Sequence, residues 1–168
     1  MLNYYIHLLS ANRAVFEDLF RGLPEVDYSW REREEKWNLK EVVCHLYDEE
    51  REDFRARIQS VFADPSKSFT PIDPQAWVKE RNYDQQDYEQ VLTKFLNERD
   101  NSISWLKSLK NPEWNNAFIH PKKGPVSARF LLVNWLAHDY LHIRQIIRIK
   151  YHHLQFSTAM SLDYAGDW

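Results

Sequence analysis

Residues 135–145 read Trp-Leu-Ala-His-Asp-Tyr-Leu-His-Ile-Arg-Gln. They lie within a segment from about Ser127 to Tyr151 that contains no proline or glycine and is rich in apolar residues, which predicts one long helix. Six residues of this segment follow one another at alternating spacings of four and three, the pattern of a helix face that packs in a bundle: Leu131, Trp135, His138, His142, Gln145 and Ile149. The stretch therefore favours an all-α fold built from packed helices.

Two histidines and a glutamine occupy this face where a helical bundle normally has leucine. Residues four apart lie about 40° apart around a helix, so the imidazoles of His138 and His142 point the same way. A polar group in a buried face costs free energy unless a partner satisfies it. A shared metal ion is one such partner, and hydrogen bonds within the core are the other. The pattern by itself weighs the two about equally.

Three more amphipathic helices are predicted upstream. Their approximate limits are 2–21, 38–62 and 84–110. The second has a clear start, because Asn38 can cap it and Glu41 can reach back to complete a capping box. Two long connections rich in proline, 64–83 and 111–125, separate the later helices. Four apolar helix faces can be buried only against one another, so we expect a four-helix bundle with long connections, in a single domain spanning residues 1–168.

Composition excludes several other classes of protein. The 168 residues include only three glycines and one cysteine, which argues against an all-β fold, a glycine-rich phosphate loop and an internal disulfide. A net charge of −3 gives no support for nucleic-acid binding. No segment resembles a signal peptide or a membrane span, so we expect a cytoplasmic protein.

A third histidine lies on the second predicted helix. His45 is at the edge of the apolar face of that helix, and Glu49 follows one turn later on the same edge. Three neutral imidazoles brought together across a bundle would form a catalytic type of site for a divalent transition metal. Glu49 is a further candidate, as a fourth ligand or a base. Cys44 points about 100° away from His45 around the helix, which suits a small buried residue better than a nucleophile.

The remaining charged residues near these positions have simpler expected roles. Asp48, Glu50 and Glu52 are expected to be solvated or paired with neighbouring arginines of the same helix. Asp139 lies well round the helix from His138 and is not expected to act as a base. Arg99 interrupts the apolar face of the third helix, where it could pair with a buried acid or extend along the surface to solvent.

Two blocks of the sequence resemble the DinB-like superfamily. The segment from Lys36 to Asp48 resembles the family pattern W-[ST]-x-x-E-x-x-x-H-L-x-D, and Gly124 to Ile146 resembles the last family helix with its H-x-x-x-H-x-x-Q-I pattern. The middle of the chain, with Trp77, Glu80, Arg81 and the Phe95-x-x-x-Arg99 spacing, is similar more loosely. One departure is Asn38, where the family often has serine or threonine, and either residue type can cap a helix.

The resemblance implies a bundle of the DinB/YfiT-like type in which three histidines hold a divalent metal. Carried over by position, these are His45, His138 and His142. Gln145 matches the glutamine of the family, and it could orient a ligand or a metal-bound water. The metal could be Zn, Ni, Fe, Co or Mn. Glu49 has no firm counterpart in the family.

The superfamily includes metal-dependent hydrolases of the YfiT type and bacillithiol transferases. The function implied is therefore a metal-dependent hydrolase or a transferase that uses a low-molecular-weight thiol, acting on a small-molecule substrate. The alternatives are a non-catalytic, stress-related bundle that binds a metal or small ligand, and a structural domain with core histidines. Surplus aromatic residues in the tail, Tyr164 and Trp168, make a homodimer an open expectation alongside a monomer.

Overall fold

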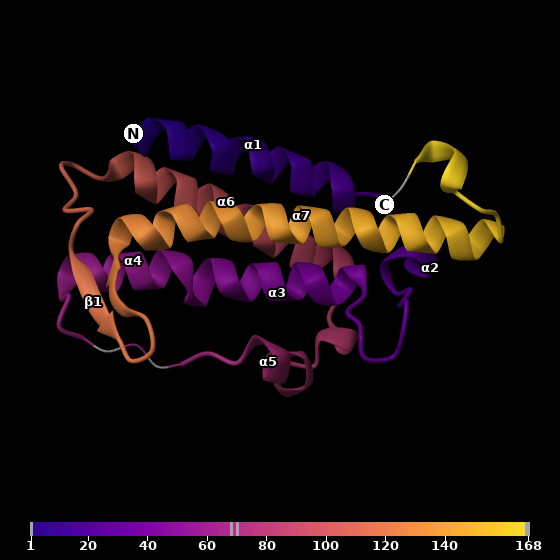
Figure 1. Cartoon of the computed structure of the whole chain (residues 1–168), viewed down its shortest axis with the longest axis horizontal. Helices are drawn as coiled ribbons and strands as arrows, with labels where there is room; N and C mark the ends of the chain where they lie inside the picture. Colours follow the sequence, from indigo (N-terminus) through magenta and orange to yellow (C-terminus); the bar gives the residue numbers. More distant parts are fainter. Residues whose placement is uncertain (1, 68, 70, 167–168) are drawn as a thin grey trace.

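A computed structural model describes residues 2–67, 69 and 71–166, and it is dominated by long helices that run lengthwise (Figure 1). The main helical segments are α1 (Leu2–Phe20), α3 (Leu39–Glu52) with its continuation α4 (Phe54–Ala63), α6 (Tyr88–Ser108) and α7 (Ala128–Thr158). Helix α1 packs against α6 and α7, α3 packs against α6, and α4 packs against α7. These contacts close a four-sided bundle, which confirms the predicted fold class.

The core of the bundle divides into two clusters along its length. One cluster is centred on Phe20, Val43 and Phe95, and the other on Leu9 and Trp135. All five side chains are fully or almost fully buried. The predicted apolar helix faces thus meet inside the bundle, where loss of water-exposed apolar area supplies the main stabilising free energy.

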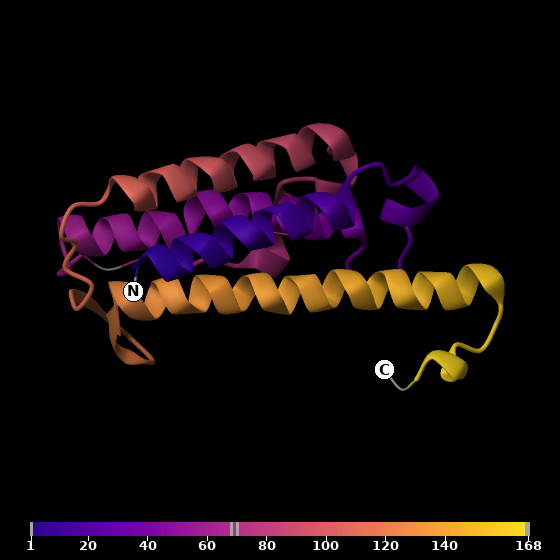
Figure 2. The same cartoon turned by 90° about the horizontal axis from the view of Figure 1, so that it is seen from above.

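Helix α7 begins where the sequence predicts but ends later. The Ser127 hydroxyl caps it by accepting a hydrogen bond from the Phe130 N–H at 3.1 Å. The helix continues past Tyr151 to Thr158, because nothing in this stretch breaks it, and ends at Ala159 in the left-handed region. Its last turns project beyond the other long helices (Figure 2). The Trp30 ring packs against His153 there, which gives the extension a partner outside the bundle.

The second predicted helix starts as expected and then divides. Asn38 and Glu41 form the predicted capping box at the start of α3. The chain leaves helical geometry at Asp53, with φ −109° and ψ −95°, and resumes as α4. No proline or glycine marks this break. The Asp53 carboxylate pairs with Arg57 four residues later, so the break coincides with a local charge contact across the start of α4.

The connections contain more structure than the sequence predicts. Helix α6 starts at Tyr88 with Asp87 as its cap, because residues 83–85 form a separate 3-10 turn. In the connection between α6 and α7, β1 (Ala117–His120) and β2 (Gly124–Ser127) form an antiparallel hairpin that pairs Phe118 with Val126. The prolines favoured an irregular segment there, and burial of these two side chains in the core explains the hairpin instead.

Shorter helices lie at the margins of the bundle. Helix α2 (Glu25–Tyr28) follows α1, α5 (Pro74–Glu80) lies within the predicted connection 64–83, and a 3-10 turn covers Asp163–Ala165. Figure 1 shows α5 outside the bundle on the side of α3. Within the described ranges, no helix has the length and apolar character required to cross a bilayer.

Candidate metal centre

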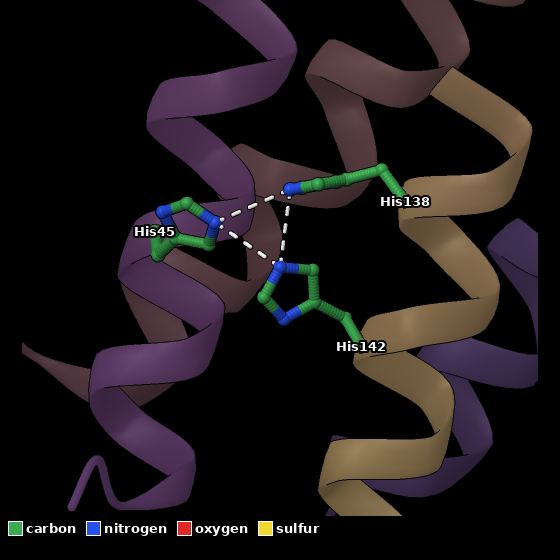
Figure 3. Close-up of side chains that lie close together, drawn as sticks. All are labelled: His45, His138 and His142. Carbon is green, nitrogen blue, oxygen red and sulfur yellow. Dashed lines mark hydrogen bonds between the residues drawn. The ribbon is translucent and has the colours of Figure 1, made fainter. Parts of the chain in front are cut away.

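Three histidine side chains from two helices converge at the centre of the interface between α3 and α7. His45 comes from α3, and His138 and His142 come from successive turns of α7, with all three rings directed toward one point (Figure 3). The Nε2 atoms of His45 and His142 are 3.1 Å apart, those of His142 and His138 are 3.1 Å apart, and those of His45 and His138 are 3.4 Å apart. The structure thus brings together all three histidines named from the sequence.

The spacing of the three nitrogens fits a divalent transition metal. Imidazole nitrogens bind Zn²⁺ at about 2.0–2.1 Å. With bonds of that length, the separations of 3.1–3.4 Å correspond to angles at the cation of about 95–116°, a range that includes the tetrahedral value and approaches the octahedral one. In the described part of the chain, these histidines are the only group of three or more potential ligands that lie close enough to share an ion. Such a set leaves further coordination positions open.

Burial holds the imidazoles in the form that binds metal. Removal from water, with a smaller contribution from His142, lowers the pKa of His45 to about 3. The pKa of His138 falls to about 2 for the same main reason, with the neighbouring imidazoles and Arg99 adding to the effect. Neutral imidazoles carry the free lone pair that a cation needs. At neutral pH each imidazole therefore carries a single N–H proton and no net charge, so one ring nitrogen of each remains available to a cation.

The glutamine predicted beside the site contacts one of the three histidines. Nδ1 of His142 donates a hydrogen bond to Oε1 of Gln145 at 2.8 Å. With its proton held on Nδ1, His142 keeps a free lone pair on Nε2, and this nitrogen faces the other two histidines. His45 differs, because its buried Nδ1 has no hydrogen-bond partner among the described residues. Its ring packs instead against Trp37, at 4.9 Å between ring centroids.

Glu49, the other residue singled out from the sequence, lies outside the histidine group. Its side chain is buried, with 5% exposed. Burial, together with the adjacent Asp53 carboxylate, raises the pKa of Glu49 to about 8. It hydrogen-bonds to Asp53 and is not a member of the group of side chains that could share the metal.

A buried charge network lies directly beside the histidines, and it corrects one expectation. Glu50 was expected to be solvated or paired with an arginine of its own helix, but only 2% of it is exposed, and it accepts from Arg99 of α6 at 2.9 Å. Trp135 Nε1 donates to the same carboxylate at 3.1 Å. Arg99 also binds Asp139, so of its two expected roles the structure selects pairing with buried acids. The sequence held one sign of this network, because Glu50 and Arg99 each interrupt an otherwise apolar helix face.

Other residues near the site have structural surroundings. Asn12 of α1 donates to Asp139 at 3.1 Å, a contact that its polar position in the first helix did not predict. Asp48 is buried and pairs with Arg51 of its own helix at 3.1 Å, one of its two expected roles. It also accepts from Tyr83 at 2.7 Å and pairs with Arg81 at 2.9 Å. Cys44 is a buried free cysteine, as expected, and burial raises the pKa of its thiol to about 12, which favours the protonated form.

Comparisons with known proteins agree with this arrangement. The family model of the DinB superfamily matches residues 8–146, which is most of the chain and includes all three histidines. Among solved structures, one similar protein is YfiT from Bacillus subtilis, described as a probable metal-dependent hydrolase with an unusual four-helix bundle topology. It superposes with a TM-score of 0.79 at 18% sequence identity, over 90% of this chain and 87% of that one, so the shared feature is the fold. No curated protein matches the sequence. The family match over most of the length, together with the shared bundle, places the chain in the DinB superfamily.

Proposed function

We propose that this protein is a metal-dependent enzyme whose divalent transition metal is held by His45, His138 and His142. The observation that carries the proposal is the convergence of three Nε2 atoms within 3.4 Å of one another. Desolvated, neutral imidazoles in that arrangement have no better partner than a cation. The description of YfiT as a probable metal-dependent hydrolase supports the same reading.

The reaction proposed is hydrolysis of a small molecule or transfer of a low-molecular-weight thiol. A divalent cation acts as a Lewis acid that lowers the pKa of a water or thiol at its open position. The chain's own residues would orient the ligands and exclude bulk water. Gln145 fixes the tautomer of His142, while Trp37 and Phe54 pack against His45 and His138. Zn, Ni, Fe, Co and Mn are all compatible with three imidazoles.

Glu49 enters the proposal as a proton-exchanging residue rather than as a ligand. A buried carboxyl group whose pKa is raised to about 8 can hold or release a proton near neutral pH. Glu49 follows His45 by one helical turn, so both residues lie on α3. The buried, protonated Cys44 thiol is consistent with a reducing cytoplasmic setting, which is proposed as well.

Metal content is the direct test of this proposal. Protein purified without an affinity tag should carry close to one transition metal ion per chain, and His142→Ala should carry far less. Added metal should raise the thermal stability of the apo wild type, because a ligand that binds only the folded state stabilises it. His7→Ala, at an exposed histidine on α1, is the matched control and should behave as wild type. Absence of metal together with an unchanged melting temperature on metal addition would exclude the site.

Turnover separates an enzyme from a binding protein. Wild type and His45→Ala would be compared on activated esters and amides, and on low-molecular-weight thiols paired with electrophiles. We expect activity that depends on His45 with one of these substrate sets. Stoichiometric metal with equal background rates for both proteins would instead favour a stress-related bundle that sequesters metal or a small ligand.

A further inference from the structure

An open groove runs along the outer side of α7 next to the candidate metal centre. It is lined by Leu141, Arg144, Gln145, Arg148 and His152. Gln145 also hydrogen-bonds to His142, so one residue that lines the groove is in direct contact with the histidine site. The arginines and His152 follow one another at intervals of four residues and therefore lie on one face of the helix.

The groove is positively charged in a protein that is acidic overall. The chain carries a net charge of −3, yet residues 140–158 of α7 contain no aspartate or glutamate. Arg144 is exposed and has no ion-pair partner among the described residues. Arg148 donates to His152 at 3.3 Å, which links the two remaining polar side chains along the groove. The arginine side chains thus offer donors that protein acids do not fully occupy.

One acid reaches the groove from outside α7. The Glu32 carboxylate accepts from Nη2 of Arg148 at 3.3 Å, a long contact in which half of the arginine side chain is exposed. Glu32 belongs to the segment between α2 and α3, and the same segment carries Trp37, which packs against His45. A carboxylate therefore already rests against this arginine, in a segment that also borders the metal ligands.

We propose that Arg144 and Arg148 bind an anionic group, a carboxylate or phosphate, of the molecule that reacts at the metal centre. Guanidinium groups bind such anions through paired hydrogen bonds. Gln145 lines the groove and also hydrogen-bonds to His142, so an anion held by the arginines would lie beside a residue that contacts the candidate metal centre. The reactive end of the same molecule would then have to pass Gln145 to reach the histidines. Glu32 would occupy part of the anion position until substrate displaces it from Arg148. This inference rests on the proposed function, because it names the substrate class of the same site.

The test uses protein loaded with Co²⁺, whose visible spectrum reports on ligands that reach the metal. A short series of ω-mercaptocarboxylates and mercaptoalkyl phosphates would be titrated against mercaptoalcohols of equal chain length. We expect one or both anionic series to bind more tightly than the alcohols. Whichever anion binds more tightly identifies the source of the negative charge.

Variants separate the groove from the metal site. Arg144→Gln and Arg148→Gln should each weaken binding of the preferred anion by about three- to tenfold, with little effect on the alcohols. Glu32→Gln should strengthen anion binding by about two- to threefold, because it removes a competing carboxylate. Arg129→Gln changes an exposed arginine at the other end of α7 and is the matched control. It should leave both affinities unchanged.

The outcomes distinguish the two proposals. Wild-type protein that binds Co²⁺ but shows equal affinity for anionic and uncharged thiols would overturn the anion site while leaving the metal centre intact. The same conclusion would follow if the arginine variants kept the full anion preference. Failure of the wild type to bind Co²⁺ would overturn the metal centre, and the anion site with it.

Discussion

Arg99 of α6 holds both carboxylate oxygens of Asp139, the residue that directly follows His138 of the candidate metal centre. Its Nη1 donates to Oδ2 at 2.6 Å and its Nη2 to Oδ1 at 2.7 Å, and the two side chains are 1% and 0% exposed. This paired contact fixes α7 against α6 within one residue of a candidate metal ligand. The ion pair is therefore expected to serve the folding of the bundle and the placement of the site.

Removal of the arginine should destabilise the protein strongly. Arg99→Met would leave Asp139 and Glu50 as buried carboxylates without a cation. We expect the free energy of unfolding to fall by about 3–5 kcal/mol. Arg129→Met, at an exposed position on α7, should change it by less than about 0.5 kcal/mol. Urea unfolding of the metal-free proteins measures both values, and a small loss in Arg99→Met would show that the network contributes little.

Loss of the glutamine beside His142 should weaken metal binding without removing it. Gln145→Ala removes the acceptor that holds the Nδ1 proton of His142. Loss of such a supporting contact typically costs about 10–100-fold in metal affinity. Competition with a chelator of known affinity gives the dissociation constant. Gln155→Ala, an exposed glutamine farther along α7, is the control, and equal constants for the two variants would refute this role for Gln145.

The metal-free protein should lose stability in mild acid. Folding lowers the pKa of His45 to about 3 and that of His138 to about 2, whereas unfolded histidines titrate near about 6.5. Below that pH the two histidines bind protons in the unfolded chain but stay neutral in the folded protein. The free energy of unfolding therefore falls as pH decreases. Each such histidine contributes up to about 1.4 kcal/mol per pH unit. Denaturant unfolding between pH 7 and 5 measures the slope.

The slope has a clear control. His138→Asn should show a shallower dependence on pH than the wild type, since it lacks one of the buried titrating groups. His7→Asn, at an exposed position, should keep the wild-type slope. Stability that does not change over this pH range would mean that the buried histidines are not held neutral by folding.

The carboxyl group of Glu49 should change stability with pH in the direction opposite to that of the buried histidines. Its pKa is raised to about 8 in the folded protein, against about 4.3 in an unfolded chain. The folded state therefore binds the extra proton, and stability from this group is lost as pH rises from about 4.3 through 8. Glu49→Gln removes that loss, so it should be more stable than wild type at pH 8–9, by about 1–3 kcal/mol.

Glu113→Gln serves as the exposed counterpart and should shift stability by less than about 0.5 kcal/mol at any pH. An advantage of Glu49→Gln that is as large at pH 4 as at pH 9 would show that the charge of Glu49 is not its cause. Unfolding free energies at a series of pH values measure both variants.

Local patterns in the sequence were sufficient to predict the helices and part of the site. Helical periodicity and end signals located the beginnings of α3 and α7, because Asn38 and Ser127 act on backbone groups only a few residues away. The spacing of His138 and His142 placed them on one face for the same reason. Two features without a clear local signal were predicted wrongly. These are the break in the second helix at Asp53 and the C-terminal end of α7.

Four amphipathic helices, their caps and a polar face with two histidines could be predicted from the sequence alone, since each depends on interactions within about four residues. The folded bundle was needed to show that the His45 ring meets those two histidines at 3.1 and 3.4 Å, and that Glu50 is buried against Arg99 of α6. These contacts depend on how helices rotate and pack against one another. That packing is set by the whole core, so no single helix encodes it.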